Sequence, residues 1–438
     1  MIDIKEVLED PYKNYIYSYP HKMSYSKFDK KINLKDLWND DISDLTLYIH
    51  IPFCANKCGY CNLFSTSDIN KDLLDKYSYK LIEEIKAIEE IFGLKLKNNN
   101  LFSNIVFGGG TPTILSELNL KNILEALKLY LNIDFSKSKL SIETSPKTLN
   151  KSKLELLKEY NLYRISIGIQ SFNENELINI NRLEPLDKID ESLGLLKNNK
   201  IKIRNLDLIY GIENQSLESF EYNLKKAISY NFEEIYLYPL YIREETYLYD
   251  KTKKNIDKMK HLYDFACEFL IKNNYIQTSM RNFINKNVKK ELYPNYSCQE
   301  NNMIGIGCGA RSYKDNIHYS RKYARLNKNI KNIINDYLQE NDFLHAKHGF
   351  NLNLDESKRR YIQKSILKIT GLNLDDFKNK FNCDPFEYKE LEFLLLNQFL
   401  IKEGNSLIPT KKGLAYSDSI GNLFISNTVK NKMLNFKE

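Results

Sequence analysis

The chain has 438 residues, of which 42% are hydrophobic and 12% aromatic, a composition that excludes disorder and has room for one large domain and a smaller companion. Its 64 basic and 57 acidic residues are mixed along the whole length, so the net charge of +7 does not indicate a nucleic-acid partner. No stretch approaches the ~20 apolar residues that cross a bilayer, and the first residues lack a signal-peptide core. We therefore expect a cytoplasmic protein with no membrane partner, whose seven cysteines indicate metal or redox chemistry before disulfides.

Short runs rich in Ile, Val and Tyr alternate with longer amphipathic segments in the first half of the chain. The runs predict six strands, at 45–51, 104–107, 139–143, 163–169, 203–210 and 234–241. Between the second and third, the apolar positions from Leu120 to Leu131 share one helical face, with Ser116 as the predicted cap. Because parallel strands need crossover connections, this alternation predicts an α/β fold of the partial (β/α)6 TIM-barrel type. A dinucleotide fold is less suitable, since no G-x-G-x-x-G follows the first strand.

The alternation fades after about residue 248, where a long helix (roughly 251–273) and a Gly-punctuated stretch (303–313) are predicted. A last segment with two helical patterns and a short β-like run predicts a winged-helix-like helical domain. The predicted divisions are an N-terminal extension (1–44), a barrel core with its extension (45–340) and the C-terminal winged-helix-like domain (341–438).

Distinctive residues follow five of the predicted strands. In a barrel the loops after the strands gather at one end, where barrel enzymes place their chemistry. The features at this end are a cysteine-rich loop, the GGGTP turn at 108–112, Glu143, Gln170 and Asp207. Their shared position predicts a functional site at the carboxyl ends of the strands.

Cys54, Cys58 and Cys61 form the spacing C-x3-C-x2-C directly after the first predicted strand. Structural zinc sites usually pair two C-x2-C elements or add histidines, and His50, the only close histidine, lies within the strand. Three thiolates on a [4Fe–4S] cube leave one iron free to bind another molecule. We therefore predict that these three cysteines are the metal ligands of such a cluster.

This spacing after the first strand of a β/α barrel resembles the radical S-adenosylmethionine (SAM) enzymes. "YIHIPFC", "FGGGTPT" and "RISIGIQSF" are similar, more narrowly, to oxygen-independent coproporphyrinogen III oxidases and their heme-chaperone and methyltransferase relatives. The resemblance covers most of residues 45–320. It implies a [4Fe–4S] cluster that cleaves SAM to a 5′-deoxyadenosyl radical, a small- or medium-sized organic substrate, and an electron donor such as flavodoxin or ferredoxin.

The resemblance also implies which residues contact SAM. The glycine turn would meet its methionine part, because residues without Cβ let the backbone approach a ligand closely. The residues matched in this way are Gly108, Gly109, Gly110, Thr111, Glu143, Gln170, Arg182 and Asp207. Tyr48 matches a tyrosine near the cluster and a second SAM, although packing in the core is an equal alternative.

The chain departs from its relatives at several positions. Leu63 stands where the porphyrinogen oxidases carry another cysteine, which weakens the prediction of coproporphyrinogen decarboxylation. The H-N-x-x-Y-W signature of the heme chaperones is replaced by "KKELYPNYSCQEN", and Arg311 stands where relatives often have histidine. These differences indicate a less-characterised subgroup, in which Arg243 and Arg311 are candidates for holding an anionic substrate and Tyr238 and Tyr241 for lining its site.

Alternative functions stay open at this point. The radical chemistry includes either oxidation or decarboxylation after hydrogen abstraction, or carbon transfer that uses a second SAM, so one or two SAM molecules are compatible with the sequence. The rival from another class is a non-catalytic heme or tetrapyrrole chaperone that carries the cluster. A third alternative is a nucleic-acid-modifying radical enzyme, for which "TKK" at 410–412 is too short a basic patch.

Overall fold

The computed structural model describes residues 4–12, 15, 18–40, 42–98, 100–289 and 302–438. Within these residues a 13-stranded sheet has the order β1-β13-β12-β11-β10-β2-β3-β4-β5-β6-β7-β9-β8. Its six central strands are β2 (Leu45–Ile51), β3 (Phe102–Gly109), β4 (Lys139–Thr144), β5 (Leu162–Gln170), β6 (Ile203–Tyr210) and β7 (Glu234–Pro239). These strands are mutually parallel, so the six predicted strands and their direction are confirmed.

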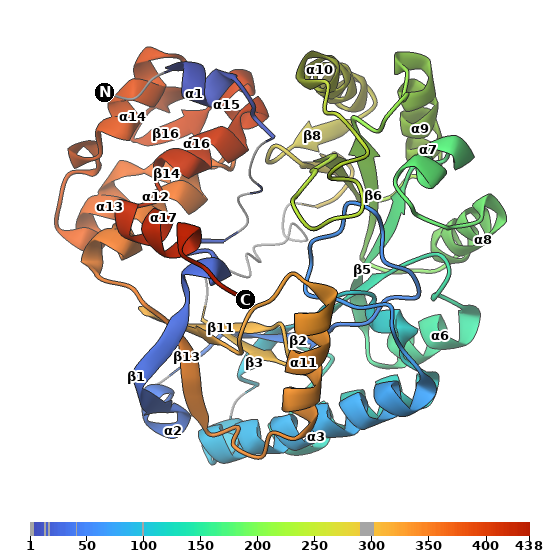
Figure 1. Cartoon of the computed structure of the whole chain (residues 1–438), viewed down its shortest axis with the longest axis vertical. Helices are drawn as coiled ribbons and strands as arrows, with labels where there is room; N and C mark the ends of the chain where they lie inside the picture. The colour runs from blue at the N-terminus through green and yellow to red at the C-terminus, as the bar shows by residue number, and fades with distance from the viewer. Residues whose placement is uncertain (1–3, 13–14, 16–17, 41, 99, 290–301) are drawn as a thin grey trace.

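Helices connect the parallel strands and cover the outer face of the sheet (Figure 1). They are α3 (Lys71–Phe92), α4 (Lys95–Asn98), α5 (Glu117–Leu131), α6 (Lys151–Glu159), α7 (Glu174–Asn179), α8 (Leu186–Lys197) and α9 (Leu217–Ser229). Helix α5 begins as predicted, because the side chain of Ser116 accepts a hydrogen bond from the backbone N–H of Asn119 at 3.1 Å. Its buried face includes Leu120, Leu127 and Leu131.

Several predicted boundaries differ from the structure, and β3, for example, extends two residues beyond 104–107 at each end. Strand β7 ends at Pro239 and not at residue 241; the N–H of Leu240 makes the last bond of the β6–β7 ladder, to the carbonyl of Tyr210. Helix α10 (Ile256–Lys272) begins five residues later than predicted, where the Asn255 side chain accepts from the N–H of Lys258 at 3.0 Å.

Further strands extend the sheet on both sides of these six. Strand β10 (Met303–Ile306) is parallel to β2, and β9 (Asn282–Asn285) pairs antiparallel with β7 and with β8 (Tyr275–Gln277). Antiparallel strands β11 (Arg311–Lys314), β12 (Ile317–Ser320), β13 (His345–Asn351) and β1 (Ser26–Asn33) extend the other side. In the described residues β7 and β10 do not pair with each other, so the parallel strands form a partial barrel, as predicted.

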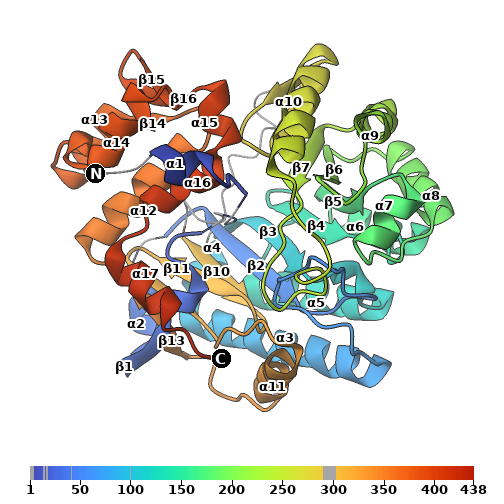
Figure 2. The same cartoon turned by 45° about the horizontal axis from the view of Figure 1, so that its top comes forward.

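The C-terminal part has its own apolar core, and helices of this part lie beside the sheet in both views (Figures 1 and 2). As predicted, two helices, α12 (Leu354–Ile366) and α14 (Lys389–Leu396), precede a hairpin of β15 (Leu400–Glu403) and β16 (Ser406–Pro409). Its other elements are β14 (Leu372–Asn373), α13 (Leu374–Phe381), α15 (Lys411–Ala415), α16 (Ser417–Leu423) and α17 (Asn427–Leu434). Val7, from the N-terminal helix α1 (Ile4–Leu8), belongs to the same core.

The remaining helices are α2 (Leu34–Leu37), beside β1, and α11 (Asn327–Leu338), which packs on α3. Among all the helices of the described residues, none combines the length and apolar character needed to span a bilayer.

The inner face of the parallel strands is polar, although the strands themselves are buried. The Nε and Nη2 atoms of Arg164 on β5 donate to Glu234 on β7 at 2.9 and 2.7 Å. Beside this pair, Asn205 donates to both Ser166 and Asp207 at 2.7 Å. Since buried polar groups cost free energy unless they are paired, these bonds make a polar interior compatible with a stable sheet.

Replacing Glu234 by Ala leaves the Arg164 guanidinium without its buried partner, and we expect a loss of about 3–5 kcal/mol in the free energy of unfolding. Its matched control is Glu191→Ala, which removes the exposed partner of Lys188 and changes stability by less than about 0.5 kcal/mol. Urea unfolding of the variants measures both effects. Equal losses would show that the interior pair does not stabilise the sheet.

Candidate functional site

The cysteine-rich loop follows β2 and is fixed by backbone hydrogen bonds. The N–H of Cys54 bonds to the carbonyl of Thr66 at 3.0 Å, and that of Cys61 to the carbonyl of Cys58 at 3.1 Å. Between them, the N–H of Gly59 bonds to the carbonyl of Ile180 at 2.8 Å, so the end of α7 supports the turn from outside. The three cysteines are therefore held in one ordered loop at the carboxyl end of β2.

The sulfur atoms of this loop have polar neighbours from other strands. Thr111 Oγ1 lies 3.7 Å from Cys54 Sγ, and Arg182 Nη1 donates to Cys58 Sγ at 3.2 Å. Burial, together with the neighbouring thiols, raises the pKa of Cys54 to about 12 and also raises the pKa of Cys61. Both thiols are therefore protonated at neutral pH unless a metal binds them and displaces the proton.

The donor set of the loop fits a cluster. In the part of the chain that the structure describes, no three His, Cys, Asp or Glu side chains converge on a point where they would share one metal ion. Each thiolate on a [4Fe–4S] cube binds a different iron, so cluster ligands do not need to converge in this way. Sulfur ligands are also the ones that iron–sulfur clusters prefer.

The glycine turn after β3 lies against the cysteine loop. A Cβ on Gly110 would lie 2.6 Å from the carbonyl oxygen of Phe53 and 2.9 Å from Cys54 Sγ, so only glycine fits there. Gly109 has φ of +115°, and its N–H donates to Glu143 Oε2 at 3.2 Å. A Cβ on Gly108 would lie 3.0 Å from the Tyr48 hydroxyl. The turn thus links the cysteine loop to the polar interior.

His50 connects these parts, a role that sequence reasoning missed. Its Nδ1 lies 3.2 Å from the Tyr48 hydroxyl and its Nε2 lies 2.9 Å from the carbonyl oxygen of Phe64. Burial lowers the pKa of His50 to about 3, so the ring is neutral at physiological pH. The available signal was the strand alternation in "YIHIPFC", which places Tyr48 and His50 on the same face of β2.

Glu143 and Asp207 are brought together inside the partial barrel. Surrounding protein and the nearby Asp207 raise the pKa of Glu143 to about 7, although its side chain remains open to the interior. Burial raises the pKa of Asp207 to about 6, against the lowering effect of its bonds from Asn205 and Ser166. Two carboxyl groups held in this way favour a cationic or hydrogen-bond-donating ligand.

Gln170 is the last residue of β5, and Arg182 lies between α7 and α8. Arg182 Nη2 donates to the carbonyl of Gly168, and Gln170 has φ of +74°, which is unusual for a residue with a side chain. Glu184 Oε2 lies 3.8 Å from Arg182 Nη2. Arg182 Nε and Glu184 Oε1 are buried and have no hydrogen-bond partner in the described residues. This unpaired donor and this unpaired acceptor favour a polar ligand that forms hydrogen bonds with them.

Of the other candidates, Tyr238 and Tyr241 lie at the end of β7, and Arg243 lies over the Tyr241 ring at 5.4 Å. Arg311 is buried on β11 and donates to Ser18, which the sequence did not indicate. Cys267 lies on α10, whereas Cys308 follows β10 and Cys383 follows α13; Cys298, with most of the "KKELYPNYSCQEN" segment, lies outside the described residues.

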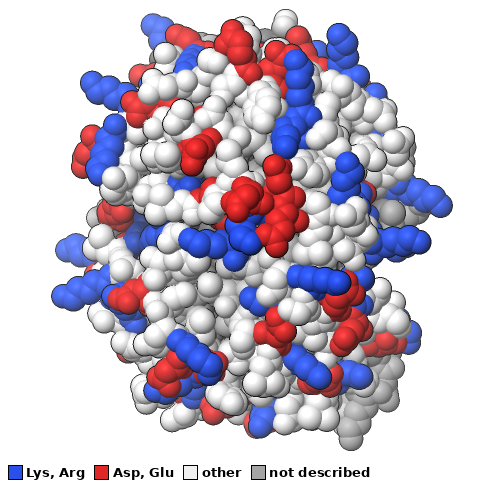
Figure 3. Space-filling view, turned by 90° about the vertical axis from the view of Figure 1, so that its right-hand side faces the viewer, with Lys and Arg blue, Asp and Glu red and all other residues white. Residues whose placement is uncertain are grey.

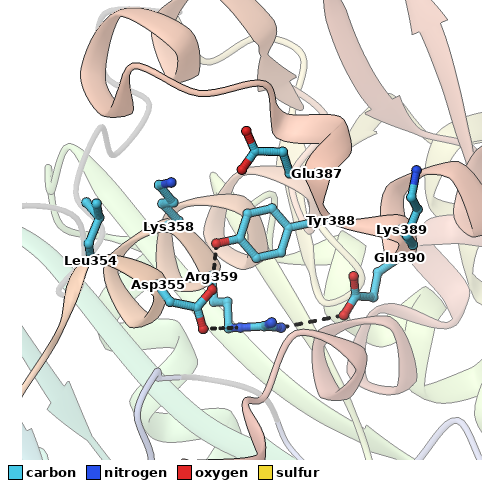
Figure 4. Close-up of a pocket in the computed structure, with 8 residues that line it drawn as sticks. All are labelled: Leu354, Asp355, Lys358, Arg359, Glu387, Tyr388, Lys389 and Glu390. Carbon is cyan, nitrogen blue, oxygen red and sulfur yellow. Dashed lines mark hydrogen bonds and ion pairs between the residues drawn. The ribbon is translucent and has the colours of Figure 1, made fainter.

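Other surface features share no residue with this site. A hollow of about 530 Å³ in the C-terminal part lies between α12 and α14 (Figure 4). Two of its carboxylates are already engaged, because Asp355 pairs with Arg359 and accepts from Tyr388 at 2.8 Å, and Glu390 also pairs with Arg359. On the face shown in Figure 3, basic and acidic side chains are interspersed, which fits a solvated surface.

Comparisons with known proteins agree with this geometry. The family described as the radical SAM superfamily matches residues 48–227. The heme chaperone HemW of Buchnera aphidicola subsp. Acyrthosiphon pisum is 30% identical over 396 residues, which cover 87% of this chain and 98% of that protein. The oxygen-independent coproporphyrinogen III oxidase of Pseudomonas aeruginosa is 25% identical over 366 residues, covering 78% and 76% of the two chains.

A solved structure shares the fold. Coproporphyrinogen III oxidase (HemN) from Escherichia coli, described as a radical SAM enzyme, superposes with a TM-score of 0.80 at 20% identity. The superposition covers 94% of this chain and 96% of that one, so the likeness extends over the barrel and the C-terminal part alike.

Replacing Gly109 by Ala places a Cβ 2.7 Å from the His50 ring on a backbone with φ of +115°. We expect a loss of about 2–4 kcal/mol in stability and a lower iron content after anaerobic reconstitution. Gly194→Ala is the control, because a Cβ there meets nothing within 4 Å inside helix α8, and alanine should stabilise it by about 0.5–1 kcal/mol. Unchanged iron content in the Gly109 variant would contradict the close packing of the turn.

Proposed function

The chain belongs to the radical SAM superfamily, in the branch of the heme chaperone HemW and the coproporphyrinogen III oxidases, and from this premise we infer that it is a radical SAM enzyme. Radical SAM proteins bind a [4Fe–4S] cluster and SAM, and the cluster supplies the electron that cleaves SAM to a 5′-deoxyadenosyl radical. The proposed reaction is hydrogen abstraction from an organic substrate, followed by oxidation, decarboxylation or carbon transfer.

The observation that carries this proposal is the convergence of the sequence candidates on one interior. The cysteine loop contacts the glycine turn through Gly110, and the turn contacts Glu143 through Gly109. Arg182 reaches the cysteine loop from the other side through Cys58. Residues from three strand ends, together with Arg182 from the segment after α7, therefore border one space next to the predicted cluster ligands, as a cluster-bound ligand requires.

Each residue has a task that suits its chemistry. We assign Cys54, Cys58 and Cys61 as cluster ligands, because thiolate sulfur binds iron. The Glu143 carboxylate would accept from an ammonium group next to the glycine turn. The planar guanidinium of Arg182 suits a carboxylate, since it offers parallel N–H donors.

The rest of the site would orient the ligand and exclude water. Asp207 offers carboxylate oxygens to ribose hydroxyl groups, with Gln170 at the rim of the same strand layer. Phe53 is fully buried and Phe64 nearly so, and both cover the cysteine loop from the side of β2. Excluding water there protects a reactive intermediate from side reactions. Tyr48 faces the glycine turn, where it would border one SAM molecule or two.

The second candidate function is a heme or tetrapyrrole chaperone. Its support is the 30% identity to HemW over 87% of the chain. Against it, the sequence lacks the H-N-x-x-Y-W signature that we associate with these chaperones. The two functions differ in a measurable way, because a chaperone binds heme stoichiometrically without consuming SAM.

Anaerobically reconstituted protein, given SAM and a strong reductant, should form 5′-deoxyadenosine, and Cys58→Ala should abolish it, because the cluster loses a ligand. Cys383→Ala, in the C-terminal part, is the matched thiol control and should retain the product. Mass spectrometry measures 5′-deoxyadenosine, with S-adenosylhomocysteine as the marker of carbon transfer. An intact cluster that binds SAM and forms neither product, together with stoichiometric heme binding, would establish the chaperone.

SAM affinity should rise with pH, because the pKa of Glu143 is raised to about 7 and only the ionised carboxylate binds an ammonium group. Between pH 6 and pH 7 the ionised fraction of such a group rises about fivefold while an α-amino group, with a pKa of about 7.8, stays mostly protonated, and we expect a similar gain in affinity over that range. Asp207, with a pKa near 6, acts in the same direction. Equilibrium dialysis of SAM against the oxidised-cluster protein measures the profile. The Glu143→Gln variant should bind SAM weakly, and its affinity should depend less on pH. An unchanged slope would show that a group other than Glu143 causes the pH dependence.

A further inference from the structure

A row of tyrosines leads away from the SAM side of the interior. Tyr236 on β7 is the direct register partner of Asp207 on β6. Tyr238, two residues further on β7, stacks on Tyr236 with ring centres 5.9 Å apart, and it lies nearer the carboxyl end of the strand. The Tyr238 ring therefore stands one layer above Asp207, towards the opening of the barrel.

The row continues through two further rings. Tyr15, from the N-terminal segment, lies 6.4 Å from Tyr238 and 5.4 Å from Tyr241, measured between ring centres. The Arg281 guanidinium lies 4.4 Å from the centre of the Tyr15 ring and donates to the Tyr241 hydroxyl. Tyrosines from two segments of the chain thus build one continuous aromatic path, and Arg281 from a third segment packs on it.

Tyr238 and Tyr241 differ in the hydrogen bonds that their hydroxyl groups make. The Tyr238 hydroxyl makes no hydrogen bond with the residues that the structure describes, and its side chain is only half-buried. Burial raises the pKa of Tyr238 well above 10, so it carries its proton at neutral pH. The Tyr241 hydroxyl instead donates to Asp418 of helix α16, which also pairs with Arg281. Tyr241 is therefore placed to pass its proton to a buried carboxylate when it loses an electron.

We propose that Tyr238 is a hydrogen-atom donor that quenches the 5′-deoxyadenosyl radical when no substrate is bound, with Tyr15 and Tyr241 as the electron path behind it. The inference rests on the proposed radical SAM function. The Tyr238 O–H bond breaks and a C–H bond forms, which gives 5′-deoxyadenosine and a Tyr238 phenoxyl radical. A phenol O–H bond is weaker than the C–H bond of a methyl group, so the transfer is downhill.

The charges and protons of the later steps balance. The Tyr238 phenoxyl takes an electron from Tyr241 through Tyr15 and a proton from water in the interior, while Tyr241 gives its proton to Asp418. One electron from the external low-potential reductant and the proton held by Asp418 then restore Tyr241. The sum is two electrons and one proton per SAM, which yields methionine and 5′-deoxyadenosine and leaves the protein unchanged.

The test is uncoupled SAM cleavage in D2O, without substrate and with titanium(III) citrate as a thiol-free reductant. Phenol protons exchange with solvent, whereas the C–H groups of the protein do not. Wild-type protein should therefore give 5′-deoxyadenosine that carries one solvent deuterium, and rapid freezing should trap a tyrosyl signal by electron paramagnetic resonance. In Tyr238→Phe the deuterium label should fall severalfold and the early tyrosyl signal should be lost.

Tyr236→Phe is the matched control, because it removes a hydroxyl from the neighbouring ring on the same strand and should keep the label. Asp418→Asn should keep the label and prolong the Tyr238 signal, because Tyr241 loses its proton acceptor. Unlabelled 5′-deoxyadenosine from the wild type, or an unchanged label in Tyr238→Phe, overturns the inference and leaves the proposed function intact. Absence of 5′-deoxyadenosine from every variant overturns both.

Discussion

The site depends on the packing of one imidazole ring between two glycines. A Cβ on Gly109 would lie 2.7 Å from the His50 ring, a Cβ on Gly309 would lie equally close, and both glycines have positive φ. The ring bonds to the carbonyl of Phe64 at the end of the cysteine loop and to Tyr48 on its own strand. The cysteine loop, the turn after β3 and the turn after β10 therefore take their spacing from a single side chain, which burial keeps neutral.

The inner face of the sheet carries polar side chains, and the outer face packs apolar side chains against the helices. Leucine and isoleucine side chains of β3 to β6 fill the space under the helices, where several of them are fully buried. On the other face, Asn205 donates to Ser166 and Asp207, and Arg164 pairs with Glu234. Among the buried polar atoms without a partner in the described residues, Arg182 Nε belongs to the side chain that bonds to Cys58, whereas Asn205 Oδ1 and Glu234 Oε1 lie on the inner face of the sheet. Unpaired polarity therefore occurs beside the cysteine loop and also deeper in the interior.

The sequence predicts features that neighbouring residues determine, and it does not predict contacts between residues far apart in the chain. Local sequence patterns predict the six parallel strands and the Ser116 cap, and the structure confirms them. The pairing of β1 with β13, the packing of Val7 in the C-terminal core and the bond from Tyr241 to Asp418 join segments from opposite ends of the chain. No local period encodes such contacts. The sequence places His50 in the first strand but does not predict its contacts, because the residues around it come from two separate turns.

The carboxyl groups of the interior bear on the choice between enzyme and chaperone. Raised pKa values mean that ionised Glu143 and Asp207 lower the stability of the folded protein near neutral pH, because the surrounding protein and neighbouring carboxylates disfavour both charges. A cluster that served only as a structural element would gain nothing from two such groups beside its loop. A ligand with an ammonium group and hydroxyls would offset this cost on binding, since it supplies the missing donors. The interior is therefore better explained by SAM that binds in a defined pose than by a cluster without a ligand.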